Sequence, residues 1–351
     1  MRIGVPREVK PLEGRVGLIP AAAAELVRHD HEVFIEKDAG LKSGYSDEQY
    51  RAVGVKILPS AAELYGKAEM IVKVKEPIEP DLKLLRKDHL LFCYLHLAAG
   101  PKLTEALKKI GLTAVAFETI EVNHHTPCLA PMSDIAGRLA VQIGTTLLHQ
   151  PNGGKGILLG GVPAAKRGHV VVVGAGVAGS AAATAAAGVG AEVTVFDIAR
   201  ERMEFARSLG PNVTGLYAHK ADIAEAVKNA DIVVGAVLVT GAKAPHVVSA
   251  DMVKSMQPGS VVVDISVDQG GCVETTKPTL WTNPTYVWEG VTHFTVTNMP
   301  GAVPRTSSQA LSAAITPYAL KLAGGHWRDD EPLRKGINVE GGKVVLPALL
   351  K

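Results

Sequence analysis

The sequence predicts an α/β fold class: two doubly wound domains with mainly parallel sheets, linked by long helices. The chain has 351 residues, and at roughly 150 residues per domain this length indicates two domains. Both halves alternate short β-rich runs with helical patterns, which is typical of βαβ units. Two longer helical patterns, over residues 131–150 and 307–323, are long enough to connect domains.

The composition is that of a globular protein, with 47% hydrophobic and 21% charged residues. The net charge is only +2 and neither half carries a basic block, so nucleic acid is a poor candidate partner. Cys93, Cys128 and Cys272 lie far apart without a CxxC pair, which argues against a disulfide framework or structural zinc. Charges near the N-terminus take the place of an apolar leader, so a cytoplasmic location is expected.

The first half is predicted to form a mainly parallel sheet, with helices such as residues 21–28 and 102–109 between its strands. A longer helix is predicted over residues 131–150, because its apolar residues recur at helical spacing before an Asn-Gly-Gly stop signal. The predicted strands of this half cover residues 2–5, 32–36, 70–75, 89–95 and 113–117.

The second half restarts the alternation, and the helix predicted over residues 307–323 falls beyond its strands. We expect this last helix to return to the first domain. The predicted domains are therefore residues 1–130 together with 305–351, and residues 131–304, which begin with the linking helix. The predicted strands of the second half cover residues 169–173, 192–197, 213–217, 231–235, 260–265 and 292–297.

Residues 170–191 carry no charge over 22 positions, close to the roughly 20 apolar residues that a membrane helix needs. Five glycines interrupt the stretch, so it is interpreted as a buried strand, a turn and a helix. No membrane partner is expected.

A glycine pattern follows the strand at residues 170–173, with Gly174, Gly176 and Gly179 in GxGxxG spacing. The first glycine permits a tight turn, the second lets the backbone approach a pyrophosphate, and the third lets the helix pack close to the sheet. The helix N-terminus adds N–H groups and a positive dipole end. The pattern predicts a dinucleotide site, and the alternative is a glycine turn used only for packing.

Asp197 ends the next predicted strand, 23 residues after Gly174, near the spacing of a ribose-binding carboxylate. A carboxylate there accepts hydrogen bonds from a free 2′-hydroxyl and repels a 2′-phosphate, which favours NAD over NADP. Arg200 and Arg202 follow closely and could offset the repulsion, or could be solvated helix charges.

Two strands of the first half end near polar side chains that could carry chemistry, because ligands of α/β sheets bind outside the carboxyl ends of strands. Lys73 and Lys75 share a face because the period of a strand is two, and Lys75 at the strand end could bind a carboxylate or polarise a carbonyl. His96 follows an apolar run and could act as a general acid or base. The alternatives are a solvated lysine and a satisfied core histidine.

The second half offers Asp264 and Asp268 after one strand and Asn298 after another. One acid could serve structure and the other function, and Asn298 could hold a nicotinamide carboxamide or start a turn. His124 and His125 are adjacent rather than four residues apart, so no metal site is expected.

Motifs along the chain resemble the alanine dehydrogenase/pyridine nucleotide transhydrogenase family. The resemblance runs in order from residue 1 to about residue 320. The tail after Gly324 is less diagnostic and short for the family. The motifs are RIGVPRE at residues 2–8 with Arg15 and Val16 soon after, VKVKEP at 72–77, YLHLA at 94–98, PMS at 131–133, LLGGVP at 158–163, GAVLV at 235–239, DQGGC at 268–272 and NMPGAVP at 298–304.

The resemblance implies an enzyme that catalyses NAD-dependent, reversible oxidative deamination of L-alanine to pyruvate and ammonium. It implies two Rossmann-like domains with a cleft between them, in a homohexamer. Residues 1–130 with 305–351 would form the substrate domain, and residues 131–304 the NAD-binding domain.

The resemblance also implies roles for individual residues. Arg15 and Lys75 would bind the substrate carboxylate and carbonyl, and Arg15 could hold the carboxylate through two parallel hydrogen bonds. His96 would be the catalytic acid/base and Asp268 its partner. Besides the glycines, the implied NAD contacts are Ser133, Val177, Ala178, Asp197, Arg202, Val237, Leu238, Ile265, Ser266, Val267, Asp268, Val296, Thr297, Asn298 and Met299.

Three other interpretations of the protein's function stay open. The first is the NAD-binding subunit of a proton-translocating transhydrogenase, which would need a hydrophobic partner subunit. The second is a dehydrogenase for another amino acid, of the lysine/saccharopine type. The third is a non-catalytic NAD-binding regulatory protein, which should keep the glycine turn but lack the acid/base residues.

Overall fold

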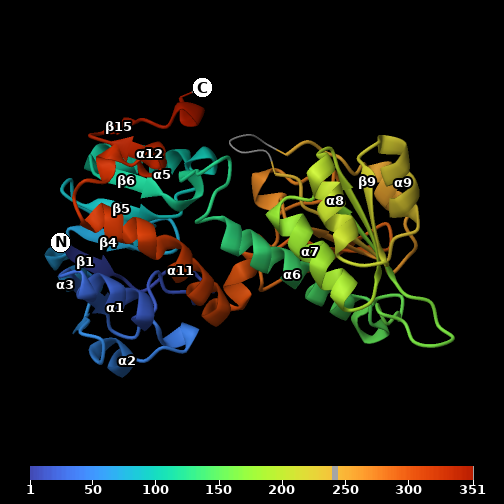
Figure 1. The fold of residues 1–351 in the computed structure, drawn as a ribbon, viewed down its shortest axis with the longest axis horizontal. Coiled ribbons are helices and arrows are strands. Elements are labelled where there is room, and N and C mark those ends of the chain that lie inside the picture. The colour runs from blue at the N-terminus through green and yellow to red at the C-terminus, as the bar shows by residue number, and fades with distance from the viewer. Residues whose placement is uncertain (239–243, 351) are drawn as a thin grey trace. The chain divides into compact units, whose positions relative to one another are not determined.

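The structure, a computed structural model, describes residues 1–238 and 244–350 and contains two compact units (Figure 1). The first unit comprises Met1–Met132 and Gly301–Lys351, and the second comprises Ser133–Pro300. Each unit has its own sheet and helices, and most strand pairs are parallel. The predicted α/β fold class is confirmed.

The first unit is built on an eight-stranded sheet in the order β15-β14-β6-β5-β4-β1-β2-β3. Neighbouring strands from β3 to β6 run parallel, so their carboxyl ends lie along one edge. The central strands are short buried apolar runs, as expected for a sheet covered on both faces. The strands are β1 (Arg2–Val5), β2 (Glu32–Glu36), β3 (Lys56–Leu58), β4 (Met70–Val72), β5 (Leu90–Cys93), β6 (Thr113–Ala116), β14 (Ile337–Glu340) and β15 (Lys343–Val344).

Helices connect these strands and bury their apolar faces on the sheet. Gly4 in β1 allows the helix that contains Leu64 to approach the sheet closely, because a Cβ added at Gly4 would lie 2.7 Å from the Leu64 side chain. The helices of the first unit are α1 (Pro20–Arg28), α2 (Asp47–Arg51), α3 (Ala61–Lys67), α4 (Glu79–Leu82), α5 (Pro101–Ile110), α11 (Pro304–Ala323) and α12 (Glu331–Lys335).

The C-terminal segment belongs to the first unit, and Figure 1 shows its red ribbon beside the blue and cyan elements. Helix α11 contacts α1. The hydroxyls of Ser308 and Ser312 accept hydrogen bonds from the backbone N–H groups of Val16 and Ile19, both at 3.0 Å. Strand β14 then pairs antiparallel with β6 and extends the sheet.

The second unit has a seven-stranded sheet in the order β12-β13-β11-β10-β7-β8-β9, parallel except for the β12–β13 pair. The chain order reverses direction at β7, which lies between β8 and β10. This is the switch point where open α/β sheets bind ligands. The elements are β7 (His169–Val173), α7 (Val177–Gly188), β8 (Glu192–Asp197), α8 (Arg200–Ser208), β9 (Val213–Tyr217), α9 (Lys220–Lys228), β10 (Ile232–Gly235), α10 (Ala250–Lys254), β11 (Val261–Asp264), β12 (Thr285–Trp288) and β13 (Val291–Phe294).

All of the predicted strands are present, although six differ from the prediction at one or both ends, and three of these differ by two residues or more. The strand predicted over residues 70–75 ends at Val72, because the N–H of Val74 donates to the carboxylate of Glu8 at 2.6 Å. The predictions over residues 89–95 and 292–297 also ran too far, since β5 ends at Cys93 and β13 at Phe294. The prediction missed β3, β12, β14, β15 and the short helices α2, α3 and α4.

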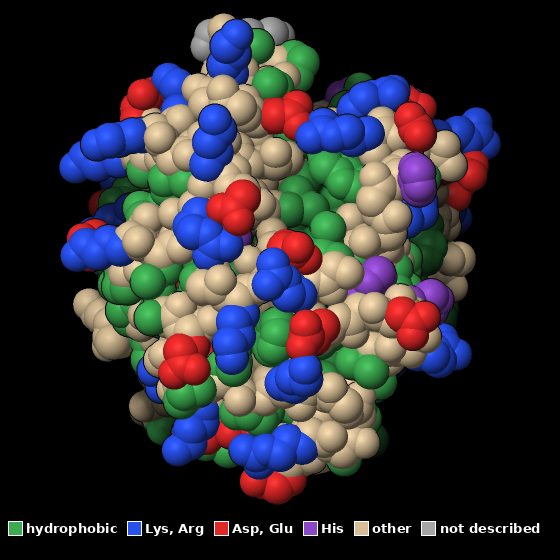
Figure 2. All heavy atoms as spheres, turned by 90° about the vertical axis from the view of Figure 1, so that its left-hand side faces the viewer, with side chains coloured by type: hydrophobic (Ala, Val, Ile, Leu, Met, Phe, Trp, Pro, Cys, Tyr) green, Lys and Arg blue, Asp and Glu red, His purple; other side chains and the backbone are tan. Residues whose placement is uncertain are grey.

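Helix α6 (Ala130–Leu147) confirms the long helix predicted over residues 131–150, and it runs across the boundary at residues 132 and 133. Within the second unit it packs closely on α7, because a Cβ added at Gly137 would lie 2.1 Å from the carbonyl oxygen of Ala178. In the described part of the chain, no helix combines the length and apolar character needed to cross a membrane. Figure 2 shows acidic and basic side chains interspersed over one face of the molecule.

Candidate active site

The candidate residues of the first unit follow three neighbouring strands. The loop after β1 carries Arg15, the segment after β4 carries Lys75, and His96 follows β5. Since β1, β4 and β5 are adjacent and parallel, their carboxyl ends bring these three segments to one edge of the sheet. The sequence pattern indicated Lys75 and His96, and the family resemblance added Arg15.

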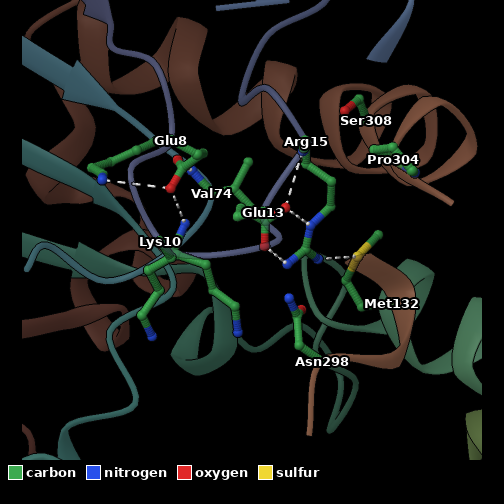
Figure 3. Close-up of polar contacts among 12 residues, drawn as sticks. Glu8, Lys10, Glu13, Arg15, Val74, Met132, Asn298, Pro304 and Ser308 are labelled. Carbon is green, nitrogen blue, oxygen red and sulfur yellow. Dashed lines mark hydrogen bonds and ion pairs between the residues drawn. The ribbon is translucent and has the colours of Figure 1, made fainter. Parts of the chain in front are cut away.

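Arg15 is buried and paired with Glu13 from the same loop (Figure 3). Its Nε donates to Glu13 Oε1 at 2.7 Å, and its Nη2 donates to Glu13 Oε2 at 2.6 Å. Its Nη1 lies 3.1 Å from the sulfur of Met132. Burial alone would lower the pKa of Arg15, but the ion pair with Glu13 raises it above the usual value. Arg15 is therefore fixed as a buried cation.

This pair changes the expected binding mode of Arg15. We predicted two parallel hydrogen bonds to a substrate carboxylate, and the Nε–Nη2 edge is the usual fork for such a contact. Glu13 already occupies that edge. A substrate carboxylate that binds Arg15 must therefore approach from another side of the guanidinium group.

The two lysines after β4 lie in different environments, so the expectation that they share a strand face is wrong. Lys73 is buried, and its Nζ lies 2.9 Å from Asp81 Oδ2 and 3.5 Å from Glu8 Oε2. Burial would lower the pKa of Lys73, but these two carboxylates raise it. Lys73 is an internal cation that organises the segment.

Lys75 lies in the same segment, and its side chain is half-buried. Burial lowers the pKa of Lys75, and the positive charge of Arg15 lowers it further. The N–H of Lys75 donates to Glu8 at 3.4 Å, so Glu8 holds the backbone around both Val74 and Lys75. Figure 3 shows this contact between Glu8 and Val74.

His96 has a left-handed backbone, with φ 49° and ψ 37°. Such a conformation is uncommon for a residue with a side chain and often marks a functional position. The N–H groups of Leu95 and His96 donate to Glu118 Oε1 at 3.1 and 2.7 Å, which holds this turn. The ring Nδ1 of His96 lies 3.2 Å from Oε2 of Glu76.

In the second unit, the predicted glycine turn follows β7 and begins α7. Gly174 has φ 93°, and a Cβ there would lie 2.7 Å from the Ala236 carbonyl oxygen. A Cβ at Gly179 would lie 1.7 Å from the carbonyl oxygen of Gly174. A Cβ added at Gly176 would have no atom of the described residues within 4 Å, apart from its chain neighbours. Gly174 and Gly179 thus allow close packing, and Gly176 leaves space at the N-terminus of α7, where Val177 and Ala178 lie.

Asp197 ends β8 as predicted, and its carboxylate holds the glycine turn. It accepts hydrogen bonds from the N–H of Ala175 at 2.7 Å and of Ala199 at 2.9 Å. Nη1 of the half-exposed Arg202 lies 3.4 Å from Oδ2 of Asp197, the oxygen that also accepts from Ala175. An ionised carboxylate has further lone pairs, so these contacts leave it able to accept from a ribose hydroxyl.

The two acids after β11 are separated by structure. Asp264 ends the strand, is buried, and accepts hydrogen bonds from the N–H groups of Ser266, Cys272 and Val273 and from the Thr276 hydroxyl. Burial raises the pKa of Asp264, and these hydrogen bonds oppose the rise. Asp268 lies exposed on a 3-10 helix over Val267–Gln269. Asp264 therefore organises the loop that presents Asp268.

The other predicted cofactor residues of this unit follow neighbouring strands. Val237 and Leu238 come after β10, residues 265–267 after β11, and residues 296–299 after β13. Asn298 has φ 107°, and its carbonyl oxygen accepts a hydrogen bond from Trp281. Ser133 lies in the first turn of α6. Val239, the last residue of the GAVLV motif, lies outside the described residues.

Several residues at these sites were missed by the sequence reading, namely Glu8, Lys10, Glu13 and Glu118. Glu13 lies two positions before Arg15, a local signal that could have been used. Glu118 is 22 positions from His96 and gives no such signal. Within residues 1–238 and 244–350, no group of three or more His, Cys, Asp or Glu side chains could hold a metal ion.

The chain matches both domain models of one family. The model "Alanine dehydrogenase/PNT, N-terminal domain" matches residues 4–136, and "Alanine dehydrogenase/PNT, C-terminal domain" matches residues 140–347. The alanine dehydrogenase of Methanococcus maripaludis is 47% identical, over 100% of this chain and 96% of that protein.

Two solved structures are similar over nearly the whole chain. An L-alanine dehydrogenase is 50% identical with a TM-score of 0.95, covering 99% of this chain and 98% of that chain. A transhydrogenase from Sinorhizobium meliloti is 26% identical with a TM-score of 0.86, covering 99% of this chain and 100% of that chain.

Proposed function

Because the chain belongs to the alanine dehydrogenase/PNT family, we propose that it catalyses the NAD-dependent, reversible oxidative deamination of L-alanine to pyruvate and ammonium. The observation that carries the proposal is the identity of 47–50% to alanine dehydrogenases over almost the full chain. The grouping of Arg15, Lys75 and His96 at one sheet edge agrees with a small, charged substrate.

We propose that the two units divide the work. Residues 1–130 with 305–351 would form the substrate domain, which contains the three groups after β1, β4 and β5. Residues 131–304 would form the NAD-binding domain, which contains the glycine turn at the switch point of its sheet.

The glycine turn and its neighbours fit NAD. Gly176 leaves room at the N-terminus of α7 for a pyrophosphate, and that helix end favours negative charge. Asp197 would accept from the ribose 2′-hydroxyl, which selects NAD over NADP. When bound, NAD accepts the hydride that leaves the alanine Cα. The remaining contacts would come from Ser133, Gly174, Val177, Ala178, Gly179, Arg202, Val237, Leu238, Ile265, Ser266, Val267, Asp268, Val296, Thr297, Asn298 and Met299.

Arg15 and Lys75 would bind the substrate. Arg15 would attract the carboxylate from a side other than its Glu13 edge, and its charge is permanent. Lys75 near the carbonyl oxygen would stabilise the negative charge that develops there when ammonia adds to pyruvate in the reverse direction. Their fixed positions would orient the Cα of the substrate for hydride transfer.

His96 would move the protons. The imine formed by oxidation of alanine must add water and then lose ammonia, and both steps transfer protons. A histidine can both accept and donate near neutral pH. Asp268, from the second unit, would be its acidic partner in the reaction and would stabilise the cationic imine and amine.

We propose that the protein is cytoplasmic and forms a homohexamer, as the resemblance implies. Light scattering coupled to size-exclusion chromatography should give a mass of about six 36.8 kDa chains. A monomeric or dimeric mass would remove the hexamer from the proposal without affecting the chemistry.

One specific observation favours a second function. The transhydrogenase of Sinorhizobium meliloti is similar over the whole chain, although its identity is only 26%. As a transhydrogenase subunit, the chain would bind NAD but would not reduce it with an amino acid.

The experiment that tests the proposal is an absorbance assay for the reduced nicotinamide. Purified protein is mixed with L-alanine and NAD, then with NADP, and then with other amino acids in place of alanine. Reduction with L-alanine and NAD is expected. Reduction only with another amino acid would contradict L-alanine as the substrate. NAD binding without reduction by any amino acid would favour a transhydrogenase subunit or a non-catalytic regulatory protein.

A further inference from the structure

Carboxylates hold His96 from two sides within the first unit. Glu118 accepts hydrogen bonds from the N–H groups of Leu95 and His96 and fixes the left-handed turn. Glu76 faces the ring, with its Oε2 3.2 Å from Nδ1 of His96. The backbone and the ring are therefore positioned by different residues.

Glu76 is itself held by a second partner. The ammonium group of Lys10 forms an ion pair with Oε1, while Oε2 faces His96. Burial pushes the pKa of Glu76 upward, but His96, Lys10 and Lys75 outweigh burial and lower the pKa below its usual value. Glu76 is thus an ionised carboxylate that joins the loop after β1 to the turn after β5.

An ionised carboxylate can only accept hydrogen bonds. The ring nitrogen that faces it must therefore carry the hydrogen, so a neutral His96 beside Glu76 has Nδ1–H and a lone pair on Nε2. The same logic governs other histidines that act as acids or bases beside a carboxylate.

We propose that Glu76 is a positioning residue that holds His96 in the Nδ1–H tautomer, so that Nε2 exchanges protons with the substrate. Lys10 keeps Glu76 aimed at the ring. This inference rests on the proposed function, because it assigns the reacting atom of the proposed acid/base.

A purely structural role for Glu76 would be the ion pair with Lys10. That pair is partly exposed, with 31% and 19% of the two side chains accessible, and such pairs typically contribute little to stability. A structural role predicts a small change in stability and no selective change in turnover. The positioning role predicts a loss in kcat.

The test compares Glu76→Gln with Glu79→Gln. Both changes remove one charge at nearly constant shape, and Glu79 lies exposed on α4, where it pairs only with exposed Lys83 in the described contacts. For Glu76→Gln we expect kcat with L-alanine to fall about 10- to 100-fold. The KM for alanine should change less than about threefold, with NAD affinity and the thermal midpoint close to wild type. Glu79→Gln should behave like wild type.

A kcat for Glu76→Gln within twofold of wild type would overturn the inference while leaving the proposed function intact. An equal loss in Glu79→Gln would also overturn it, because the effect would then come from charge in this region generally. A wild-type protein that does not oxidise alanine would instead contradict the proposed function.

A direct measurement of the tautomer distinguishes failure of the inference about Glu76 from failure of the proposed function. Nitrogen NMR of histidine-labelled protein, at a pH where histidine is neutral, reports which ring nitrogen carries the hydrogen, and His96→Gln identifies the signal. We expect Nδ1–H in the wild type and a mixture in Glu76→Gln. An Nε2–H signal for His96 in the wild type would overturn the inference whatever the enzyme's activity.

Discussion

Side-chain carboxylates hold the candidate substrate groups of the first unit, whereas the backbone forms most of the candidate cofactor site of the second. Glu13 fixes the Arg15 guanidinium, and Glu8 fixes the backbone at Lys75. In the second unit, Gly176 opens a helix N-terminus, while Asp197 and Asp264 use their oxygens mainly to hold backbone N–H groups.

The difference matches the two kinds of ligand that we propose. A small substrate such as alanine offers few atoms, so a few charges must be held in fixed positions. A dinucleotide offers a long surface with phosphates, which backbone N–H groups and a helix end can bind. Charge changes in the first unit should therefore alter turnover, and backbone changes in the second should alter NAD affinity.

The largest expected effect comes from removing the proposed acid/base. His96→Ala and Asp268→Ala should each lower kcat about 1,000-fold, within the range for general acid–base catalysis, while NAD affinity stays within about threefold. Steady-state kinetics and NAD titration measure both quantities. His124→Ala, in an exposed loop, is the control and should keep normal turnover. Near-normal turnover in either variant would show that its assigned role is wrong.

A change in the glycine turn should act on NAD affinity. Gly179→Ala places a Cβ 1.7 Å from a carbonyl oxygen and must displace the turn. Overpacking of this kind costs about 1–3 kcal/mol or more, so NAD affinity should fall on the order of 100-fold. Gly188→Ala, at the far end of the same helix in open space, is the matched control. Equal NAD affinities for Gly179→Ala and Gly188→Ala would contradict the expectation that backbone changes in the second unit alter NAD affinity.

A change at Asp197 should act on the choice of dinucleotide. Asp197→Asn removes the charge that repels a 2′-phosphate but keeps one oxygen for the turn, so the preference for NAD over NADP should relax about tenfold. Asp222→Asn, on the exposed side of α9, is the control. The ratio of kcat/KM for NAD and NADP measures the effect, and an unchanged ratio would count against the ribose assignment.

The smallest expected effect is a pH dependence of substrate binding. Because the pKa of Lys75 is lowered, its ammonium group loses its proton below the pH at which an ordinary lysine does, about 10.5. Pyruvate binding to the enzyme with reduced nicotinamide should therefore weaken as the pH rises toward that value. Lys75→Arg should lose this dependence, because arginine stays charged, and Lys83→Arg should keep it. Identical pH curves for wild type and Lys75→Arg would contradict the role of Lys75.

The sequence predicted most of what depends on local pattern. The strands at Arg2–Val5 and His169–Val173 and the glycine turn follow from hydrophobic runs and GxGxxG spacing, and all are confirmed. The strand was expected to end at Lys75 but ends at Val72, because the N–H of Val74 donates to the distant Glu8 instead of a neighbouring strand.

What the sequence could not give depends on contacts between distant residues. Glu118 accepts a hydrogen bond from the N–H of His96, although 22 positions separate the two residues, and no local pattern around Glu118 predicts this contact. The Arg15–Glu13 ion pair is different, because these residues lie two positions apart and their spacing is a local signal. The short tail adds β14 and β15 to the first sheet, although its sequence is the least diagnostic part of the chain.

The most direct test of the account follows the hydrogen at the alanine Cα. The protein is incubated with NAD and L-alanine carrying deuterium at Cα, and the reduced nicotinamide and the keto acid are analysed by mass spectrometry. The account predicts one deuterium in the reduced nicotinamide for each pyruvate formed. Reduced nicotinamide without deuterium, or no reduction at all, would contradict it.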